Sequence, residues 1–338
     1  MVNKKSFLFT FLGYVLLMSL VFLPSESFGK TLKIGHIFVP ASFQHQALEK
    51  VFKPYVEEKS GGSLKVEVFP NEQLGHAPDQ VEAVKLGMQE MFLGSFAWWG
   101  AHVEETEIPN IPFMFDDRDH YHKWIDQILV PKLMPVLIKN ANQRFINLDY
   151  KWHRGPFRVL CSKRAIFAPE DLKGLRLRLW PARAVQRTWQ GFGANTVTID
   201  WSEAYLALKQ GVVEAITAPL DVVWPQKFTE ITKYITELKQ FPQLEIISIN
   251  ENVWQALDKS EQKILLAAVE KAGRWYNDKT ESSVQSTIDN NLIKEHNAFY
   301  IKLNRQPFVD LFRNKILPKL IEDGTVKEKH MEGVIATR

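Results

Sequence analysis

The stretch from residue 169 to residue 219 constrains the fold of this chain more than any other part of its sequence. After an opening turn, leucines at positions 175, 177 and 179 alternate with Arg176 and Arg178. This two-residue period is typical of a strand with one buried face, so the two arginines share the opposite face. A polar segment follows, and a β-branched run at 196–199 then predicts a second short strand.

Trp201 follows this second strand, and Ser202 then offers a hydroxyl that can cap a helix beginning at WSEAYLAL. Side chains at strand ends and helix starts point into the clefts between layers. An arginine beside a tryptophan in such a place can hold a carboxylate with an apolar body, because the guanidinium fork matches two oxygens and stacks on rings. We therefore expect a pocket for an organic anion near Arg178 and Trp201.

The first 29 residues have the pattern of a secretory signal peptide. Two lysines precede an apolar run at 7–23, and small residues at 27 and 29 flank Phe28. We predict cleavage after Gly29. The alternative is a retained membrane anchor, because a run of about 17 residues lies at the lower edge of what spans a bilayer. No cysteine follows the apolar run, so lipidation of the mature N-terminus is not indicated.

Charge and cysteine content exclude several classes of protein. Lysine and arginine number 42 against 39 acidic residues, and these charges are interspersed, so nucleic-acid binding has no support. The single cysteine, Cys161, rules out an internal disulfide framework and every multi-cysteine metal motif. With 338 residues and 45% apolar content, the chain is long enough for two globular domains.

The first half of the mature sequence alternates predicted strands with predicted helices. Strands at 31–40, 64–68 and 91–95 are separated by helices that begin at Ser42 and Pro78. This order is typical of an α/β fold with a parallel sheet covered by helices. Ligands in such sheets bind beyond the carboxyl ends of the strands. The site candidates that follow the third strand are Ser95, Phe96, Trp98 and Trp99.

Two strand-like runs are predicted to pass between the domains. The run at 145–161 crosses first, with a hinge at Gly155-Pro156 and Arg158 two residues beyond it. The run at 241–250 crosses back, and a helix from residue 252 to about residue 290 follows it. That helix is longer than the mean of about 11 to 12 residues.

Seven segments, in this order, carry a family resemblance: LKIGHIFVP, KSGGSLKVEVFPNEQLGHAPDQVEAVKLGMQEM, IPNIPFMFDD, PEDLKGLRLRL, GANTVTIDWSEAYLALKQGVVEA, KFTEITKYIT and NVWQALDKSEQKILLAA. They resemble the solute receptors of tripartite ATP-independent periplasmic (TRAP) transporters, the DctP-like family. The resemblance covers nearly the whole mature chain. Several ordered motifs make it far more specific than any single motif would.

The resemblance implies a two-domain periplasmic binding protein of type II-like α/β architecture, with hinge strands and a long helix that spans both domains. It implies no enzyme activity and no cofactor. Such a protein captures an organic acid in the periplasm and delivers it to the membrane permease subunits of a TRAP transporter. Members of the family are mostly monomers, with some dimers. The expected division is a signal peptide at 1–29, domain I at 30–154 with 244–283, and domain II at 155–243 with 284–338.

The resemblance also assigns site residues. The arginine that pairs with the ligand carboxylate in the family corresponds to Arg178, and a cleft-facing arginine corresponds to Arg158. Trp201 corresponds to an aromatic residue that packs on the ligand body. Ala218 stands where many members carry an asparagine that helps to hold the carboxylate, so one polar contact is missing and Thr217 is the candidate to replace it.

The nature of the ligand body is predicted from two departures. Ser95 and Phe96 stand where sialic-acid-binding relatives have a glutamate, which argues against a polyhydroxylated sugar acid. Six tryptophans are expected around the cleft, so we predict a monocarboxylate with an apolar or aromatic body, such as an aryl or branched-chain acid, held by Arg178 and Arg158. These tryptophans are Trp98, Trp99, Trp152, Trp180, Trp201 and Trp224.

Other chemistry has little support in the sequence. The His120-Tyr121-His122 run is interpreted as a helix surface, and no metal site is predicted. There is no nucleophile elbow, no zinc-protease motif and no phosphate loop. Two other classes stay open, a sensory protein that presents its ligand to a membrane receptor and a periplasmic enzyme. A cation bound beside the ligand also stays open.

Overall fold

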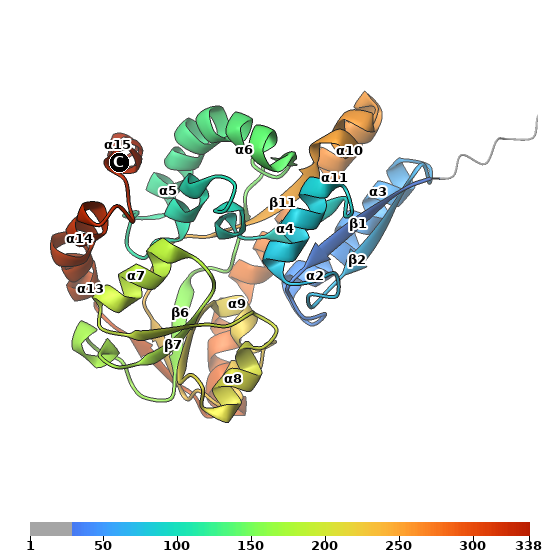
Figure 1. The fold of residues 1–338 in the computed structure, drawn as a ribbon. Helices are drawn as coiled ribbons and strands as arrows, with labels where there is room; N and C mark the ends of the chain where they lie inside the picture. Colours follow the sequence, from blue (N-terminus) through green and yellow to red (C-terminus); the bar gives the residue numbers. More distant parts are fainter. Residues whose placement is uncertain (1–28) are drawn as a thin grey trace, which may run out of the picture.

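The chain folds around two six-stranded sheets, each covered by helices (Figure 1). The computed structural model describes residues 29–338, so the predicted signal peptide up to residue 28 lies outside the described residues. Within residues 29–338, no helix combines the length and the apolar character needed to cross a membrane.

The first sheet has the strand order β2-β1-β3-β11-β4, with β5 also paired to β11. β1 pairs in parallel with both β2 and β3, as the alternation of strands and helices predicted, and β11 runs antiparallel to β3 and β4. The strands are β1 (Lys30–His36), β2 (Leu64–Phe69), β3 (Met91–Gly94), β4 (Gln143–Phe145), β5 (Trp152–His153) and β11 (Leu244–Asn250).

The helices that connect the parallel strands begin where the sequence predicted them. The hydroxyl of Ser42 accepts a hydrogen bond from the backbone nitrogen of His45 (3.3 Å), which caps the first of them. The next helix ends at Gly87, whose φ of 74° is the left-handed conformation that closes many helices. These helices are α2 (Phe43–Ala47), η1 (Leu48–Phe52), α3 (Lys53–Lys59) and α4 (Ala77–Leu86).

The second sheet has the order β12-β10-β6-β9-β7-β8. β7 pairs in parallel with β8 and β9, and the period-two leucines at 175, 177 and 179 are fully buried, which confirms the predicted strand. The strands are β6 (Arg158–Ser162), β7 (Arg176–Leu179), β8 (Asn195–Thr198), β9 (Ala215–Pro219), β10 (Tyr234–Glu237) and β12 (Phe299–Lys302).

The predicted cap at Ser202 is wrong. Residues 201–203 form a turn, and α8 (Ala204–Gln210) begins after it with Glu203 at the capping position and no side-chain cap. The backbone nitrogen of Ser202 instead donates to Oε2 of Glu72, 3.2 Å away in a loop beside the first sheet.

The chain crosses between the sheets at the predicted hinge. β5 lies in the first sheet and β6 in the second, and Gly155 between them has a φ of 69°. A Cβ atom at this position would lie 2.7 Å from Oδ1 of Asp221, so both the backbone conformation and the neighbouring carboxyl require glycine. The return crossing lies between β10 and β11.

The predicted long helix is divided. α10 (Glu251–Ala256) ends before Asp258, whose carboxylate accepts from the backbone nitrogens of Ser260 and Glu261 and starts α11 (Lys259–Ser282). Its continuation, α12 (Val284–Ser286) and η7 (Thr287–Glu295), reaches the second sheet, where η7 packs on β12. The helix that spans the two sides is therefore α11 with its continuation η7, and α10 is a separate helix.

The C-terminal helix α15 (Glu328–Ala336) belongs to the residues expected in domain II, 284–338, and contacts a helix from the residues expected in domain I. It packs beside α5 (Arg118–Trp124), where Nε2 of His120 lies 2.7 Å from the carbonyl oxygen of Val334. Figure 1 shows α15 close to α5. His120 is buried by this contact, so the interpretation of its run as a helix surface is wrong.

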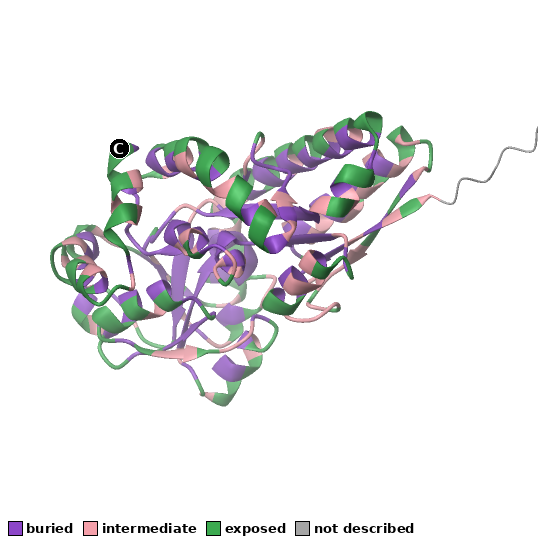
Figure 2. Cartoon of the chain, turned by 45° about the horizontal axis from the view of Figure 1, so that its top comes forward, coloured by how far each residue is buried: buried purple, intermediate pink, exposed green. Residues whose placement is uncertain are grey.

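The strands form the buried centre and the helices expose their outer faces (Figure 2). Every residue of β9 and β11 is buried. The other helical segments are η2 (Phe96–Trp99), η3 (Glu104–Asn110), η4 (Ile125–Leu133), α6 (Met134–Ala141), η5 (Pro169–Leu172), α7 (Arg183–Gly191), α9 (Leu220–Val223), η6 (Phe228–Glu230), α13 (Gln306–Leu311), η8 (Phe312–Ile316) and α14 (Leu317–Glu322).

Candidate functional site

A cavity lies between the two sheets, where β1, β3 and β7 reach their carboxyl ends. The space not filled by atoms measures about 300 Å³, including the part that opens to solvent. Six of the eight residues predicted for the site line this cavity, together with three that were not predicted. The lining residues are Ile37, Ser95, Trp98, Arg154, Arg158, Arg178, Trp180, Trp201 and Gln243.

Arg178 lines the cavity with a guanidinium N–H group that donates no hydrogen bond within the described residues. β7 places Arg178 on the face opposite its buried leucines, yet it is only 2% exposed, because it lies near the carboxyl end of the strand among the residues that line the cavity. Its Nε donates to the carbonyl oxygen of Ile199 (2.7 Å), and its guanidinium carbon lies 5.3 Å from the ring centre of Trp201. Its Nη2 is buried and has no hydrogen-bond partner among the described residues.

The charge of Arg178 persists despite this burial. Burial lowers the pKa of its guanidinium to about 10, and the nearby carboxylates of Asp200 and Glu72 oppose that shift. The group is therefore a cation at neutral pH. A buried cation with a free N–H group favours an anionic partner that accepts hydrogen bonds. Arg176, its neighbour in the strand, is exposed and pairs with Glu214.

Arg158 is held firmly by its neighbours. Its Nη1 donates to Oε1 of Gln243 (2.6 Å), and its Nη2 donates to the hydroxyl (2.7 Å) and the carbonyl oxygen (2.8 Å) of Thr217. Thr217 does not line the cavity. It therefore orients Arg158 from the neighbouring strand β9, a supporting position that the sequence did not distinguish from direct contact.

The surroundings of Arg158 are aromatic and positively charged. Its guanidinium carbon lies 5.4 Å from the ring centre of Trp180 and 5.1 Å from that of Phe241. Burial, followed by the guanidinium groups of Arg154 and Arg178, lowers the pKa of Arg158 well below its usual value. An anion placed among these groups would relieve that repulsion.

Arg154 and Gln243 are the polar lining residues that the sequence did not reveal. Arg154 is 5% exposed and its Nε lies 3.0 Å from Oε1 of Glu245. Gln243 donates from its Nε2 to the hydroxyl of Ser95 (2.8 Å). Both flank the chain crossings, since Arg154 precedes the hinge glycine and Gln243 precedes β11. The two predicted crossings were the signal that could have found them.

Ser95 lines the cavity, whereas Phe96 does not. The hydroxyl of Ser95 donates to Oδ1 of Asn110 (2.9 Å) and accepts from Gln243, neither of which is a general base. The 3-10 helix η2 begins at Phe96 and turns this ring into the core, 5.8 Å from Phe145. The expectation that Phe96 contacts the ligand is therefore wrong for this cavity.

Three of the six tryptophans line the cavity: Trp98, Trp180 and Trp201. The indole nitrogen of each has no hydrogen-bond partner among the described residues. The other three lie elsewhere, and each indole nitrogen donates to a protein oxygen. These pairs are Trp99 with Gln143 (2.9 Å), Trp152 with Val269 (3.0 Å) and Trp224 with Glu295 (3.2 Å).

A buried polar cluster lies behind the cavity at the hinge. Nε2 of Gln44 donates to Oδ2 of Asp221 (3.0 Å) and lies 3.2 Å from Oε1 of Glu245. The hydroxyl of Tyr276 donates to the same Asp221 oxygen (3.2 Å) and accepts from the backbone nitrogen of Gly155 (3.3 Å). These residues come from α2, α9, β11 and α11, so the cluster joins both sides of the molecule.

The two carboxyl groups of this hinge cluster favour their protonated forms. Burial raises the pKa of Asp221 to about 6 and that of Glu245 to about 7, although the guanidinium of Arg154 opposes both shifts. Asp221 Oδ1 and Glu245 Oε2 are buried without hydrogen-bond partners among the described residues, which also disfavours two full charges.

Polar contacts also join the two sides close to Arg178. Besides its bond from Ser202, the carboxylate of Glu72 lies 3.2 Å from Nδ1 of His76. Nε2 of the same ring lies 3.6 Å from Oδ2 of Asp200, which follows β8 on the other side. The hydrogen bond to Glu72 raises the pKa of His76, which favours the cation between the two carboxylates.

The family model described as bacterial extracellular solute-binding protein, family 7, matches residues 34–317. A solute-binding protein of Verminephrobacter eiseniae is 30% identical over 248 residues, which cover 72% of this chain and 71% of that protein. The 2,3-diketo-L-gulonate-binding periplasmic protein YiaO of Escherichia coli is 25% identical over 303 residues, which cover 89% of this chain and 90% of that protein.

Solved structures show the same architecture. A TRAP periplasmic solute-binding protein from Sulfurospirillum deleyianum, with bound succinate, superposes with a TM-score of 0.80 at 26% sequence identity. The superposition covers 91% of this chain and 99% of that chain. The two-sheet arrangement is therefore that of a periplasmic binding-protein fold.

Proposed function

This chain belongs to family 7 of the bacterial extracellular solute-binding proteins, the DctP family, and we propose that it is a periplasmic receptor that captures an organic acid for a TRAP transporter. The observation that carries this proposal is the buried guanidinium of Arg178, whose Nη2 is unpaired beside a cavity between the two sheets. The acids that the relatives carry in their names, 2,3-diketo-L-gulonate and succinate, are consistent with such a partner.

The ligand carboxylate would bind to Arg178, with Arg158 beside it. Two parallel N–H···O bonds from a guanidinium fork fix the plane of a carboxylate. Hydrogen bonds to charged groups contribute about 1.5–3 kcal/mol each, so this contact supplies much of the affinity. Arg158 already donates to Thr217 and Gln243, and its charge therefore acts on the ligand from a fixed position.

The body of the ligand would lie against the three lining indoles. Trp98, Trp180 and Trp201 offer flat apolar faces and three free N–H groups. The unfilled space of about 300 Å³ includes solvent at the opening, so the enclosed part suits only a small ligand. A small acid with an apolar, branched or aryl body fits these features, and carbonyl oxygens on that body would accept from the indoles.

Capture would proceed by closure about the crossing strands, with domain I at 30–154 and 244–283 and domain II at 155–243 and 284–338. A ligand favours the closed state only as far as it binds that state more tightly than the open one. Contacts to both sides provide this difference, and exclusion of water strengthens the pairing with arginine. No covalent step and no cofactor are part of the proposal, and the receptor acts as a monomer.

The proposed function requires export to the periplasm and a membrane partner. The N-terminal segment 1–29 would direct export to the periplasm and be removed after Gly29. The loaded receptor would then dock on the membrane permease subunits of a TRAP transporter. Neighbouring genes for a small and a large permease subunit would support transport over a sensory role.

A thermal-shift screen of the protein from residue 30 onward tests the function. The panel holds small organic acids, each with its neutral amide. A ligand at a hundred times its dissociation constant stabilises the native state by about 2.7 kcal/mol, which raises the melting temperature measurably. We expect an acid to shift the melting temperature and its amide to have no effect. Equal shifts from acid and amide would contradict the role of the arginines.

A further inference from the structure

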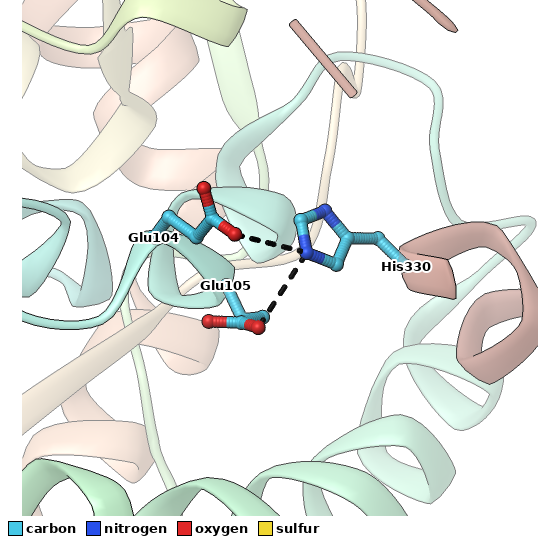
Figure 3. A group of neighbouring side chains, drawn as sticks. All are labelled: Glu104, Glu105 and His330. Carbon is cyan, nitrogen blue, oxygen red and sulfur yellow. Dashed lines mark ion pairs between the residues drawn. The ribbon is translucent and has the colours of Figure 1, made fainter. Parts of the chain in front are cut away.

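Three metal-ligating side chains meet far from the cavity, where η3 approaches α15 (Figure 3). Nε2 of His330 lies 3.6 Å from Oε1 of Glu104 and 3.5 Å from Oε1 of Glu105. All three atoms lie within 4.8 Å of one another. The three residues come from segments more than 200 residues apart, so no local motif in the sequence predicts that they lie together.

His330 is unusual among the three because it is buried but unsatisfied. Its side chain is only 8% exposed, and its Nε2 has no hydrogen-bond partner among the described residues. Figure 3 shows this nitrogen directed at the two carboxylates. A neutral imidazole nitrogen in this position is a common ligand of metal ions.

The separations of Nε2 of His330 from the two carboxylate oxygens suit a tetrahedral ion. Bonds of about 2.0–2.2 Å from zinc to imidazole and carboxylate, at tetrahedral angles, place neighbouring donor atoms about 3.3–3.6 Å apart. The two distances from His330 agree with this range. One neutral nitrogen and two carboxylates also match the ligand types that zinc accepts.

We propose that Glu104, Glu105 and His330 form a zinc-binding site that fastens the C-terminal helix α15 to η3. Water completes the coordination on the open side, where Glu104 is half exposed. This proposal does not depend on which ligand the cavity binds. The site is nevertheless connected to the cavity lining, because η3 ends at Asn110, which accepts hydrogen bonds from the lining residues Ser95 and Gln243.

Two lysines compete with the metal for the carboxylates. Lys327 pairs with Glu104, and Nζ of Lys329 lies 3.2 Å from Oε1 of Glu105. Both lysine side chains are about half exposed, at 49% and 59%. Exposed ion pairs of this kind are weak, so the lysines can turn into solvent when zinc binds. Their positive charges still weaken zinc binding, and we therefore expect micromolar rather than nanomolar affinity.

Isothermal titration of the purified protein with zinc chloride tests the site. The wild type is expected to bind one ion, and the H330Q variant to bind at least about tenfold more weakly. The K327Q/K329Q variant is expected to bind more tightly than the wild type, because it removes two repelling charges. H102Q is the matched control, since His102 is a half-buried histidine that faces a single carboxylate, Glu82 (3.4 Å).

The outcomes are distinguishable. Absence of zinc binding by both the wild type and K327Q/K329Q would overturn the site, as would H330Q binding as tightly as the wild type. If H330Q does not fold, E104Q/E105Q replaces it, because both carboxylates have exposed surface. Cobalt provides a second readout, since a tetrahedral site gives intense visible absorption and an octahedral spectrum would contradict the proposed geometry.

Discussion

Nη1 of Arg158 lies 2.6 Å from Oε1 of Gln243, and this hydrogen bond joins the chain crossing at Gly155 to the crossing that precedes β11. Arg158 is the first residue of the strand that enters the second sheet, and Gln243 directly precedes the strand that returns to the first. Gln243 also donates to Ser95 at the end of β3. One amide therefore orients an arginine from one side and a serine from the other.

Replacing Gln243 by alanine is expected to lower both stability and ligand affinity. The change leaves a buried guanidinium N–H of Arg158 without its acceptor and removes the donor to the Ser95 hydroxyl, at a cost of about 1–3 kcal/mol in the free energy of unfolding. Urea denaturation measures this cost. Gln255, exposed on α10, is the control, and Q255A should change the unfolding free energy little. An equal loss in both variants would contradict the role of Gln243.

Arg178→Ala is expected to reduce the affinity for the identified acid by about 100-fold, from the loss of hydrogen bonds to a charged group. Lysine should restore little of this, because it lacks the planar fork. Titration calorimetry measures the affinity, and a melting curve checks folding. Arg176→Ala, two residues along the same strand but exposed, should bind normally. Retention of wild-type affinity by Arg178→Ala would exclude this residue as the carboxylate partner.

Gly155→Ala is expected to destabilise the protein more than Gly174→Ala. Both glycines have left-handed backbones, with φ of 69° and 71°. A Cβ at Gly155 would lie 2.7 Å from Asp221, whereas nothing lies within 4 Å of one at Gly174. The Gly174 variant therefore measures the backbone cost alone, about 1–2 kcal/mol. Equal losses in chemical denaturation would show that Asp221 moves aside freely.

The hinge carboxyls give a pH dependence of known sign. Asp221 and Glu245 have folded-state pKa values of about 6 and about 7, above their ordinary values of 3.8 and 4.5. The folded state therefore holds protons that the unfolded state has released. The stability from these groups is complete below about pH 4 and is lost as the pH rises through about 6 to 7.

Unfolding free energies measured by urea between pH 4 and pH 8 test this sign. Glu245→Gln should flatten the fall across the upper part of this range, because the amide is neutral throughout. Glu322→Gln, on the exposed face of α14, should leave the slope unchanged. A wild-type stability that rises across the range, with no difference in Glu245→Gln, would show that both carboxyls are ionised when folded.

The strands and the outline of the site could be predicted because they depend on local pattern. Leucines at every second position specify β7, and the same period places Arg178 on the other face. Trp98 and Trp180 follow strand ends, where parallel sheets place their ligands. In each case the sequence pattern lies within a few residues of the side chain whose position it predicts.

The remainder depends on contacts between distant segments. Arg154 becomes a lining residue because Glu245, 91 positions later, lies beside it in the fold. Phe96 turns into the core because η2 begins at that residue, a local helix that composition does not distinguish from a loop. Asp258 follows the end of α10 and caps α11. The apolar period continues across this break, so the sequence pattern predicted one helix instead of two.

The chain passes between the two sides not once but four times: at Gly155, before β11, where α11 continues into η7, and between α14 and α15. Because the chain connects the two sides at four places, the two sides cannot move independently of each other. We expect these connections to limit the relative motion of the two sides to an opening rotation. Under the proposed closure, few orientations would then be lost on binding, so little of the binding free energy would be spent on ordering and more would remain as affinity.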